Sequence, residues 1–410
     1  MAPVLKDIKV LDFSRIFAGP DSTQILGDLG ADVIKVEDPR GGDECRTLGA
    51  TREELEKLGG PSAPFRSFNR NKRSITLDLA NAAGRKAATA LLARSDVVVN
   101  NFRPGTMEKF GLGYDAAKAA NPGLIYCDFH AYGPVGPMAH IGANDLALQA
   151  YSGLMSLTGE EDGPPARAGG AIIDLHASLA IVAAVMAALY HRERTGAGQR
   201  IDTSLLLSSA HLMSYFYQEY WLTGKMHHRM GTANHLSVPN QAFPTRDGHV
   251  IIIAPSDEMW RRCATALAPQ KLLREEFRTA SERLRLRKQV VEAITEITRE
   301  MTNAEVHQLL SAVKVNVAIV QDIGQAADSA QLEAVGGIFE YGDKDEASRY
   351  VATPFRLHST PSAMHRPPPA LGEHTTEVLA EAGFAQAEIA ELMAAGATGA
   401  VSPAPAGGTT

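Results

Sequence analysis

Asp174 is the residue whose type and position in this sequence most directly suggest chemistry. It follows a loop of small residues, Ala168-Gly169-Gly170-Ala171, and opens an apolar run that extends to Tyr190. Charged residues at 191–194 and a glycine at 196 end the run, so we expect a helix that begins with Asp174 as its N-cap. A helix that is apolar all round must be buried in protein.

The Asp174 carboxylate has two interpretations. In the first it only caps the helix, accepting hydrogen bonds from the first free backbone N–H groups. In the second, the positive end of the helix dipole keeps the carboxylate ionised and available as a nucleophile. The glycines before it would then let a bulky substrate approach the backbone closely. This stretch alone does not decide between the two.

Other kinds of catalytic site find no support in the sequence. His227-His228 and the isolated histidines lack paired spacing with carboxylates, so we predict no metal site. There is no G-x-S-x-G elbow and no P-loop, and no G-x-G-x-x-G fingerprint follows the first expected strand. Asp174 therefore remains the candidate nucleophile by elimination.

Four basic residues stand next to expected strands, in segments that we interpret as loops. In open α/β sheets such loops are where ligands bind. Cations gathered there in an acidic protein favour an anionic ligand that carries phosphates. These residues are Arg70, Lys72, Arg73 and Arg103.

Strands and helices are expected to alternate through the first half of the chain. The order of strand, loop, helix and strand at its start predicts a doubly wound α/β domain with a parallel sheet. Strands are expected at 8–13, 32–37, 75–78, 97–102, 124–129 and 199–202, and helices at 22–29, 82–93 and 205–222.

The pattern changes after residue 222, which predicts a second, smaller domain. Residues 1–222 are expected to form the first part of the large α/β domain, and 223–320 a small α+β domain. A Pro-rich segment and a further helix predict that 321–396 return to the large domain. Residues 397–410 are mainly Ala, Gly, Pro, Ser and Thr, so we expect a disordered tail.

The bulk composition bounds the class of protein. The chain has 410 residues and a net charge of -7, which argues against a nucleic-acid partner and favours solubility. Its three scattered cysteines indicate reduced thiols. We find no signal peptide, and the apolar run after Asp174 falls short of the roughly 18 residues of a membrane span. We therefore expect a cytoplasmic protein without a membrane partner.

Taken together and in order, nine stretches identify a family resemblance. The sequence resembles the class III coenzyme A-transferases, the family that includes formyl-CoA transferase, carnitine-CoA transferase and the α-methylacyl-CoA racemases. The resemblance covers nearly the whole chain. Its stretches are VLDFSRIFAGP, LGDLGADVIKVEDP, NRNKRSITLDL, VVVNNFRPG, GLGYDAAKAANPGLIYC, GANDLALQAYSGLMSLTG, GGAIIDLHASL, HRERTGAGQRIDTSLL and RPPPALGEHT.

The resemblance implies a fold and an assembly. It implies a large Rossmann-like α/β domain built from both chain ends, with a small domain between them. It also implies a homodimer whose subunits are threaded through each other as interlocked rings. Coenzyme A would be a co-substrate, with no tightly bound cofactor, and the other substrates would be acyl-CoA and carboxylic acids.

The resemblance also assigns Asp174 as the catalytic aspartate of a ping-pong reaction. Its carboxylate would attack a donor acyl-CoA to form a mixed anhydride, and CoA thiolate would convert that anhydride to an aspartyl-CoA thioester. The acceptor acid would repeat the steps in reverse. This chemistry needs an anionic carboxylate and backbone N–H groups for the oxyanion. By similarity, the CoA contacts are Ile16, Phe17, Lys72, Arg73, Asn101, Phe102 and Arg103.

Departures from the family pattern bear on the substrate. Asp38 stands where some members carry an Arg that contacts CoA. Asn144 stands where racemases carry a His base, and an amide cannot take a proton from carbon, which favours transfer over racemisation. The short stretch MGTANHLSVPNQAFPTRDG resembles the members that use succinyl-CoA and small dicarboxylic acids.

Four residues are candidates for the acceptor-acid site, and two other functions stay open. The candidates are Arg46, Asn144, Asn234 and His235. The alternatives to CoA transfer are a racemase or epimerase of 2-methylacyl-CoA and an acyl-CoA-binding relative without turnover.

Overall fold

A computed structural model describes residues 2–342 and 347–399, and it divides the chain into two compact units. Unit 1 comprises Met1–Gly153, Ala168–Thr223 and Val335–Thr410, and unit 2 comprises Leu154–Arg167 and Gly224–Ala334. Relative to the predicted domains, unit 2 adds the segment 154–167 and extends to 334 instead of 320.

A six-stranded parallel sheet forms the centre of unit 1. Its order, β3-β2-β1-β4-β5-β6, is that of the doubly wound dinucleotide-binding fold, with the order reversing between β1 and β4. This confirms the predicted α/β class and parallel sheet. The strands are β1 (Lys9–Asp12), β2 (Asp32–Glu37), β3 (Lys72–Thr76), β4 (Val97–Asn100), β5 (Ile125–His130) and β6 (Arg200–Ser204).

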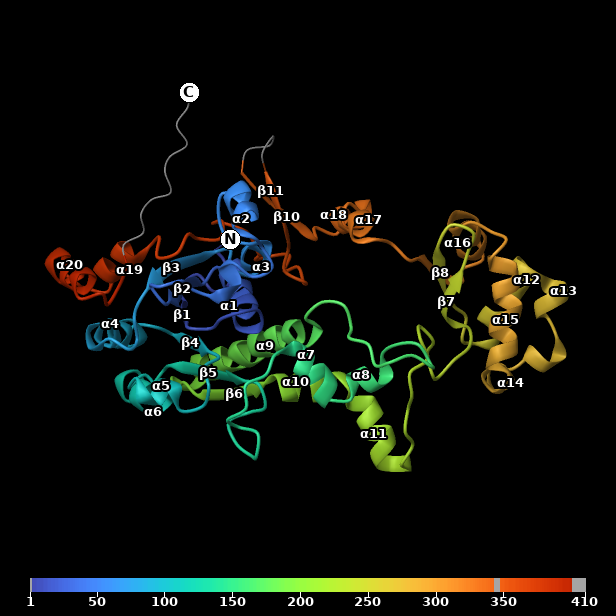
Figure 1. The fold of residues 1–410 in the computed structure, drawn as a ribbon, viewed down its shortest axis with the longest axis horizontal. Coiled ribbons are helices and arrows are strands. Elements are labelled where there is room, and N and C mark those ends of the chain that lie inside the picture. Colours follow the sequence, from blue (N-terminus) through green and yellow to red (C-terminus); the bar gives the residue numbers. More distant parts are fainter. Residues whose placement is uncertain (1, 343–346, 400–410) are drawn as a thin grey trace, which may run out of the picture. The chain divides into compact units, whose positions relative to one another are not determined.

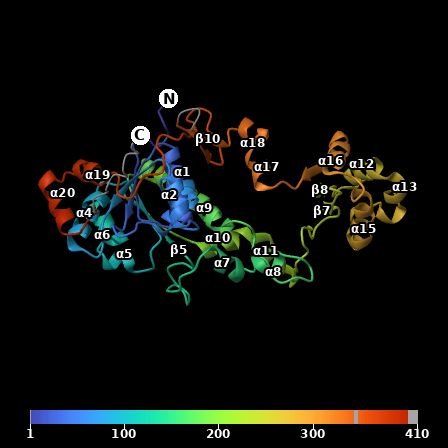
Figure 2. The ribbon, with the colours of Figure 1, turned by 45° about the horizontal axis from the view of Figure 1, so that its top comes forward.

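Helices from both ends of the chain cover one face of this sheet. Buried residues of α4 (Ala82–Leu92), α19 (Thr375–Glu381) and α20 (Gln386–Ala394) share one apolar core with Leu11 and Ile75 of the sheet. Figure 1 shows the red helices α19 and α20 near β3 and α4, and Figure 2 shows α19 and α20 beside α4. The C-terminal segment is therefore part of the large unit.

Helices α1 (Ala18–Asp28) and α9 (Ile172–Thr195) pack together on the other face. Their buried residues form a second apolar core with Val10, Val97 and Ile125 of the sheet. Each fully buried aliphatic side chain contributes about 1.5–3 kcal/mol. The first turn of α9 is thereby held close to the ends of β1, β4 and β5.

Helix α9 is longer and less buried than the sequence predicts. It begins at Ile172. Its most apolar window has a mean hydropathy of 2.1, so by length and composition alone the helix could cross a membrane. The prediction that its apolar run is too short for a membrane span is therefore wrong. A core helix passes the same test. Leu175, Leu179 and Tyr190 are 42%, 42% and 66% exposed in this single chain, so the prediction of burial on all sides is also wrong for the chain alone.

Unit 2 is built on a three-stranded antiparallel sheet. Strands β7 (Asn240–Pro244) and β8 (His249–Ile253) form the hairpin expected from Asp247-Gly248, and β9 (Asn316–Ile319) pairs with β8. Its helices pack an apolar core onto this sheet. The core residues come from α12 (Asp257–Leu267), α13 (Pro269–Leu272), α15 (Arg287–Thr298), α16 (Asn303–Ala312) and the 3-10 turn Glu275–Phe277. The unit also contains α14 (Ala280–Arg285), α17 (Ile323–Ala327) and α18 (Ala330–Ala334).

Two local predictions are corrected within unit 1. The helix expected over 205–222 is two helices, α10 and α11. The tail expected to be disordered from 397 is ordered through Gly399, because Ala397 is buried and Thr398 bonds Thr76; residues 400–410 lie outside the described residues.

The remaining elements of the described chain belong to unit 1, except α8, which belongs to unit 2. They are α2 (Arg52–Leu58), α3 (Ala63–Phe68), α5 (Thr106–Lys109), α6 (Tyr114–Ala120), α7 (Asp145–Tyr151), α8 (Leu154–Leu157), α10 (Leu205–Leu212), α11 (Ser214–Thr223), β10 (Ile338–Tyr341) and β11 (Ser348–Val351), with the 3-10 turn Glu44–Arg46.

Candidate active site

A cavity of about 270 Å³ lies in unit 1 at the carboxyl ends of β1, β4 and β5. This is where the strand order reverses, the position at which open α/β sheets bind ligands. Its lining residues come from the end of β5, from the loops that follow these strands, from the segment before α7 and from the starts of α1, α9 and α10. They are Arg15, Ile16, Phe17, Ala18, Asn101, Phe102, Arg103, Pro104, Phe129, His130, Ala131, Ala139, Ile141, Gly142, Ala143, Asn144, Asp174 and Leu205.

Asp174 lines this cavity, but it is not the N-cap of its helix. The N-cap of α9 is Ala171, and Asp174 is the third helical residue. Asp145 does the capping: its Oδ2 accepts hydrogen bonds from the backbone N–H groups of Ile173 (2.7 Å) and Asp174 (3.2 Å). The other Asp145 oxygen accepts a bond of 2.5 Å from Gln149. The predicted capping role therefore belongs to a different aspartate.

The charge state of Asp174 also differs from the prediction of a carboxylate kept ionised by the helix dipole. Burial, and secondarily the negative charge of Asp145, raise the pKa of Asp174 to about 7. Two of the helical N–H groups that would favour the anion are already bonded to Asp145. No hydrogen bond to the Asp174 carboxylate comes from the described residues. A poorly solvated carboxylate near neutrality is a stronger nucleophile than an ordinary one, because basicity and nucleophilicity rise together.

Asp174→Asn is expected to stabilise the folded protein at pH 8. A carboxyl whose folded pKa lies above its unfolded value destabilises the fold progressively as pH rises from about 4 to about 7, and the loss persists above 7. Asparagine does not ionise, so the free energy of unfolding at pH 8 should rise by roughly 2–4 kcal/mol. Urea unfolding at pH 8 and at pH 4 measures this, and a gain that is equal at both values would contradict the raised pKa.

Five of the seven predicted CoA contacts meet at the Asp174 cavity. They are Ile16, Phe17, Asn101, Phe102 and Arg103. Asn101 also fixes the first loop, because its Oδ1 accepts from Arg15 N (3.0 Å) and its Nδ2 donates to Arg15 O (2.8 Å). The loops after β1 and β4 are thereby joined across the floor of the cavity.

Lys72 and Arg73 do not reach this cavity, and the prediction that they contact CoA there needs correction. They are the first two residues of β3, not loop residues. Lys72 Nζ is fully buried and donates to Asp12, Pro20 O and Asn69 at 2.7–3.1 Å, and burial lowers the pKa of Lys72 to about 8.

Arg73, Arg70 and Arg46 are likewise held by carboxylates of the fold. Arg73 pairs with Asp32, Glu377 and Glu381, and Arg70 pairs with Asp28 at 2.6 Å. Arg46 pairs with Glu37 at 2.7 Å, donates to Pro369 O and lies over the ring of Phe65. Side chains that are at least nine-tenths buried and already bonded are not available to hold phosphate or an acceptor carboxylate, which corrects the sequence prediction for Arg46.

Lys72→Met is expected to act on stability. Removing the ammonium leaves the buried Asp12 carboxylate without its ion-pair partner, so the free energy of unfolding should fall by about 3–5 kcal/mol. Denaturant unfolding measures the effect, with the exposed Lys86→Met as the matched control, which should change it by less than about 0.5 kcal/mol. Equal stability of the two variants would show that Lys72 is not a structural ion-pair partner.

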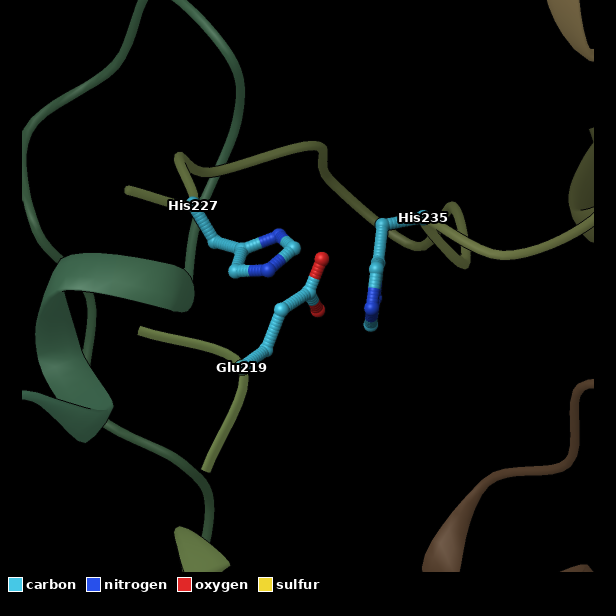
Figure 3. Close-up of side chains that lie close together, drawn as sticks. All are labelled: Glu219, His227 and His235. Carbon is cyan, nitrogen blue, oxygen red and sulfur yellow. The ribbon is translucent and has the colours of Figure 1, made fainter. Parts of the chain in front are cut away.

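The other predicted acceptor-site residues fall in different places. Asn144 lines the Asp174 cavity, and its side chain caps α7 by accepting from Ala147 N at 3.2 Å. Asn234 and His235 belong to unit 2, where Asn234 O accepts from Arg287 at 2.8 Å. Figure 3 shows the ring of His235 beside that of His227, with ring centroids 4.4 Å apart; Glu219, also drawn, belongs to unit 1.

Sequence reasoning missed His130, Arg15 and Asp145. His130, the last residue of β5, is 7% exposed and lines the cavity, and neither of its ring nitrogens has a partner among the described residues. A histidine at the carboxyl end of a buried parallel strand was the available signal. Asp145 could not be found from the sequence, because its contact with Asp174 spans 29 positions.

Two further cavities share walls with the first. One of about 380 Å³ shares Arg103, Pro104 and His130 with it, and one of about 160 Å³ shares Arg15 and Phe102. The smaller cavity also contains Asp38 and Arg40, which form an ion pair of 2.7 Å. The carboxyl edge of the sheet thus offers three adjoining cavities for a long ligand with cationic groups along it.

Comparison with known proteins identifies the class. The model of CoA-transferase family III matches residues 5–375, so the chain belongs to this family, as the sequence resemblance predicts, and it is an enzyme of this class. CoA-transferases use CoA thioesters as co-substrates.

Named relatives and solved structures agree with this assignment. The chain is 35% identical to the succinate–glutarate CoA-transferase of Agrobacterium fabrum, covering 92% of this chain and 96% of the relative. It is 34% identical to human succinyl-CoA:glutarate CoA-transferase (96% and 89%) and 31% to the succinyl-CoA–D-citramalate CoA-transferase of Chloroflexus aurantiacus (95% and 97%). A CAIB/BAIF family protein from Brucella suis superposes with a TM-score of 0.83 at 33% identity, covering 93% of this chain and all of the other.

Proposed function

We propose that this protein moves CoA from succinyl-CoA, or a similar acyl-CoA of a dicarboxylic acid, to a second small carboxylic or dicarboxylic acid. The names of three relatives, which pair succinate or succinyl-CoA with glutarate or citramalate, support this choice of substrates. The observation that carries the proposal is that Asp174, buried and with a pKa raised to about 7, shares one cavity with five predicted CoA contacts.

In the proposed mechanism the ionised Asp174 carboxylate attacks the carbonyl carbon of the donor thioester. The C–S bond breaks, CoA leaves as a thiolate, and Asp174 and the acyl group form a mixed anhydride. The thiolate then attacks the Asp174 carbonyl of the anhydride, which releases the donor acid and leaves an aspartyl-CoA thioester. The acceptor carboxylate attacks this thioester, and the same steps in reverse give the new acyl-CoA and free Asp174.

The described residues have separate roles in this proposal. Ile16, Phe17 and Phe102 supply apolar wall for the pantetheine arm. Arg103 and Arg15 are the cations of the cavity lining, and they suit phosphate or carboxylate groups of the ligands. Arg40 lines the smaller adjoining cavity and pairs there with Asp38, which stands where some family members carry an Arg.

Racemisation of a 2-methylacyl-CoA is the alternative that one observation keeps open. Asn144 lacks the basicity of the racemase histidine, but His130 brings an imidazole to the lining of the same cavity. A racemase would exchange the α-proton of an acyl-CoA in the absence of any acceptor acid.

One assay separates the candidate functions. The enzyme is incubated with succinyl-CoA and isotope-labelled glutarate, citramalate, mesaconate or acetate, and thioesters are followed by mass spectrometry; 2-methylacyl-CoA in deuterium oxide serves as the parallel substrate. Label in a new dicarboxylic thioester supports the proposal. Deuterium exchange without transfer would replace it with racemisation, and bound CoA with neither reaction would indicate a binding protein.

The homodimer, the interlocking of its subunits and the cytoplasmic location stay predictions. The exposed apolar side chains of Leu175 and Leu179 on α9 support an assembly in which a second copy covers them. Light scattering of the purified protein tests the dimer.

A further inference from the structure

The loop between β1 and α1 contains a strained residue. Ile16 has a φ of 72°, in the left-handed region that glycine adopts freely and a β-branched residue adopts only at a cost. It is 37% exposed and lines the Asp174 cavity. Such strain persists only where the surrounding structure over-determines the backbone.

Two buried side chains, Asp43 and Lys35, bond the backbone of this loop. The backbone N–H of Ile16 donates to both carboxylate oxygens of Asp43, at 3.1 and 3.3 Å. Lys35 Nζ donates to Asp43 Oδ2 and to Ser14 O, each at 2.9 Å. The side chains of Lys35 and Asp43 are both 0% exposed, so they form a fully buried ion pair under the loop.

Asn101 holds the same loop from the other side. With its two bonds to Arg15, four backbone groups of three consecutive residues, 14–16, are all bonded by side chains from other segments. A buried ion pair is weak evidence for stability by itself. Here the ion pair and Asn101 all bond the backbone of one strained loop, which indicates a role in fixing the conformation of that loop.

We propose that Asp43 and Lys35 are positioning residues, which hold Ile16 in its left-handed conformation so that Ile16 and Phe17 form the wall of the acyl-CoA cavity. The inference rests on the proposed function, because it takes the cavity to be the acyl-CoA site. Neither residue lines the cavity, so both act through the backbone of the loop.

Removal of Asp43 in two backgrounds tests the strain. In the natural background, Asp43→Ala should raise the KM for acyl-CoA at least tenfold and change kcat less than threefold, since Ile16 relaxes from its strained conformation. In an Ile16→Gly background the same change should raise KM threefold or less, because glycine keeps the positive φ unaided. Equal KM effects in the two backgrounds would overturn the proposal.

A second measurement needs no substrate. Arg15 precedes Ile16, so a released loop exposes a trypsin site, and cleavage after Arg15 should accelerate at least tenfold in Asp43→Ala. Asp28→Ala, which breaks the buried pair with Arg70, is the matched control and should change neither KM nor this cleavage by more than twofold. Unchanged cleavage in Asp43→Ala would also overturn the proposal.

A double variant keeps the test available if Asp43→Ala does not fold. Asp43→Ala/Lys35→Met leaves no uncompensated buried charge, and it should reproduce the KM and cleavage effects if Asp43→Ala does not fold. Failure of the wild-type protein to transfer CoA would refute the proposed function, while the cleavage experiment would still decide whether Asp43 holds the loop.

Discussion

Asp174→Asn is expected to lower the rate of CoA transfer by at least about 10³-fold, the scale on which removal of a covalent nucleophile acts in enzymes. The amide keeps the shape of the side chain but cannot form the mixed anhydride. Binding of free CoA should stay within about threefold, because the cavity wall is unchanged. Transfer from succinyl-CoA is followed by mass spectrometry, and CoA binding by calorimetry.

The matched control is Asp115→Asn. Asp115 lies in the first turn of helix α6, is exposed and is absent from the lining of the Asp174 cavity. Its replacement should leave transfer within twofold of the natural rate. An Asp174→Asn protein that transferred CoA at a similar rate would refute the assignment of the nucleophile.

The second large effect is on the pH dependence of kcat/KM, which reports the ionisation of the free enzyme. Only the ionised Asp174 attacks, and its pKa is raised to about 7 by burial and by Asp145. We therefore expect kcat/KM to fall about tenfold per pH unit below pH 7 and to be level above it. An ordinary aspartate would give a level profile down to about pH 4.

Asp145→Asn should move this fall in kcat/KM, the acidic limb of the pH profile, to lower pH. The substitution removes the like charge beside Asp174 but leaves the burial, so the pKa of Asp174 should fall without reaching its ordinary value. It should also destabilise the protein by about 1–3 kcal/mol, since both Asp145 oxygens accept hydrogen bonds and an amide offers one acceptor.

His130→Gln is the control for this pH dependence, because the imidazole of His130 lines the same cavity as Asp174. The limb should stay in place in this variant. If the fall in kcat/KM below pH 7 were lost in His130→Gln and unchanged in Asp145→Asn, the histidine and not Asp174 would control the reaction.

The order of elements was largely predictable because hydrophobic pattern is local. Strand β2 was expected at 32–37 and lies there, and the alternation of strands and helices correctly predicted a parallel sheet. Strand β3 shows where local pattern fails. It was expected at 75–78, with Lys72 and Arg73 in the loop before it, yet it spans Lys72–Thr76. Carboxylates on neighbouring segments neutralise both side chains, so a charged pair can occupy a buried strand.

Family resemblance and local sequence together located much of the candidate site. Five expected CoA contacts follow strands, and strand ends in a parallel sheet converge on one edge. The partners of Arg46 and Lys72 came from tertiary packing, which made these two residues structural. His130 was not singled out because the expected strand ended at 129, whereas β5 extends to His130 and places it at the carboxyl end of the strand.

For Asp174 itself, the sequence determined the residue, the helix that follows it and the family to which the chain belongs. Only the tertiary structure decided its ionisation. Asp145, from a segment 29 positions earlier, bonds the helix N–H groups and places a second negative charge beside a carboxyl that packing has removed from water. Burial and charge proximity are properties of three-dimensional arrangement, and they set the pKa that the proposed chemistry uses.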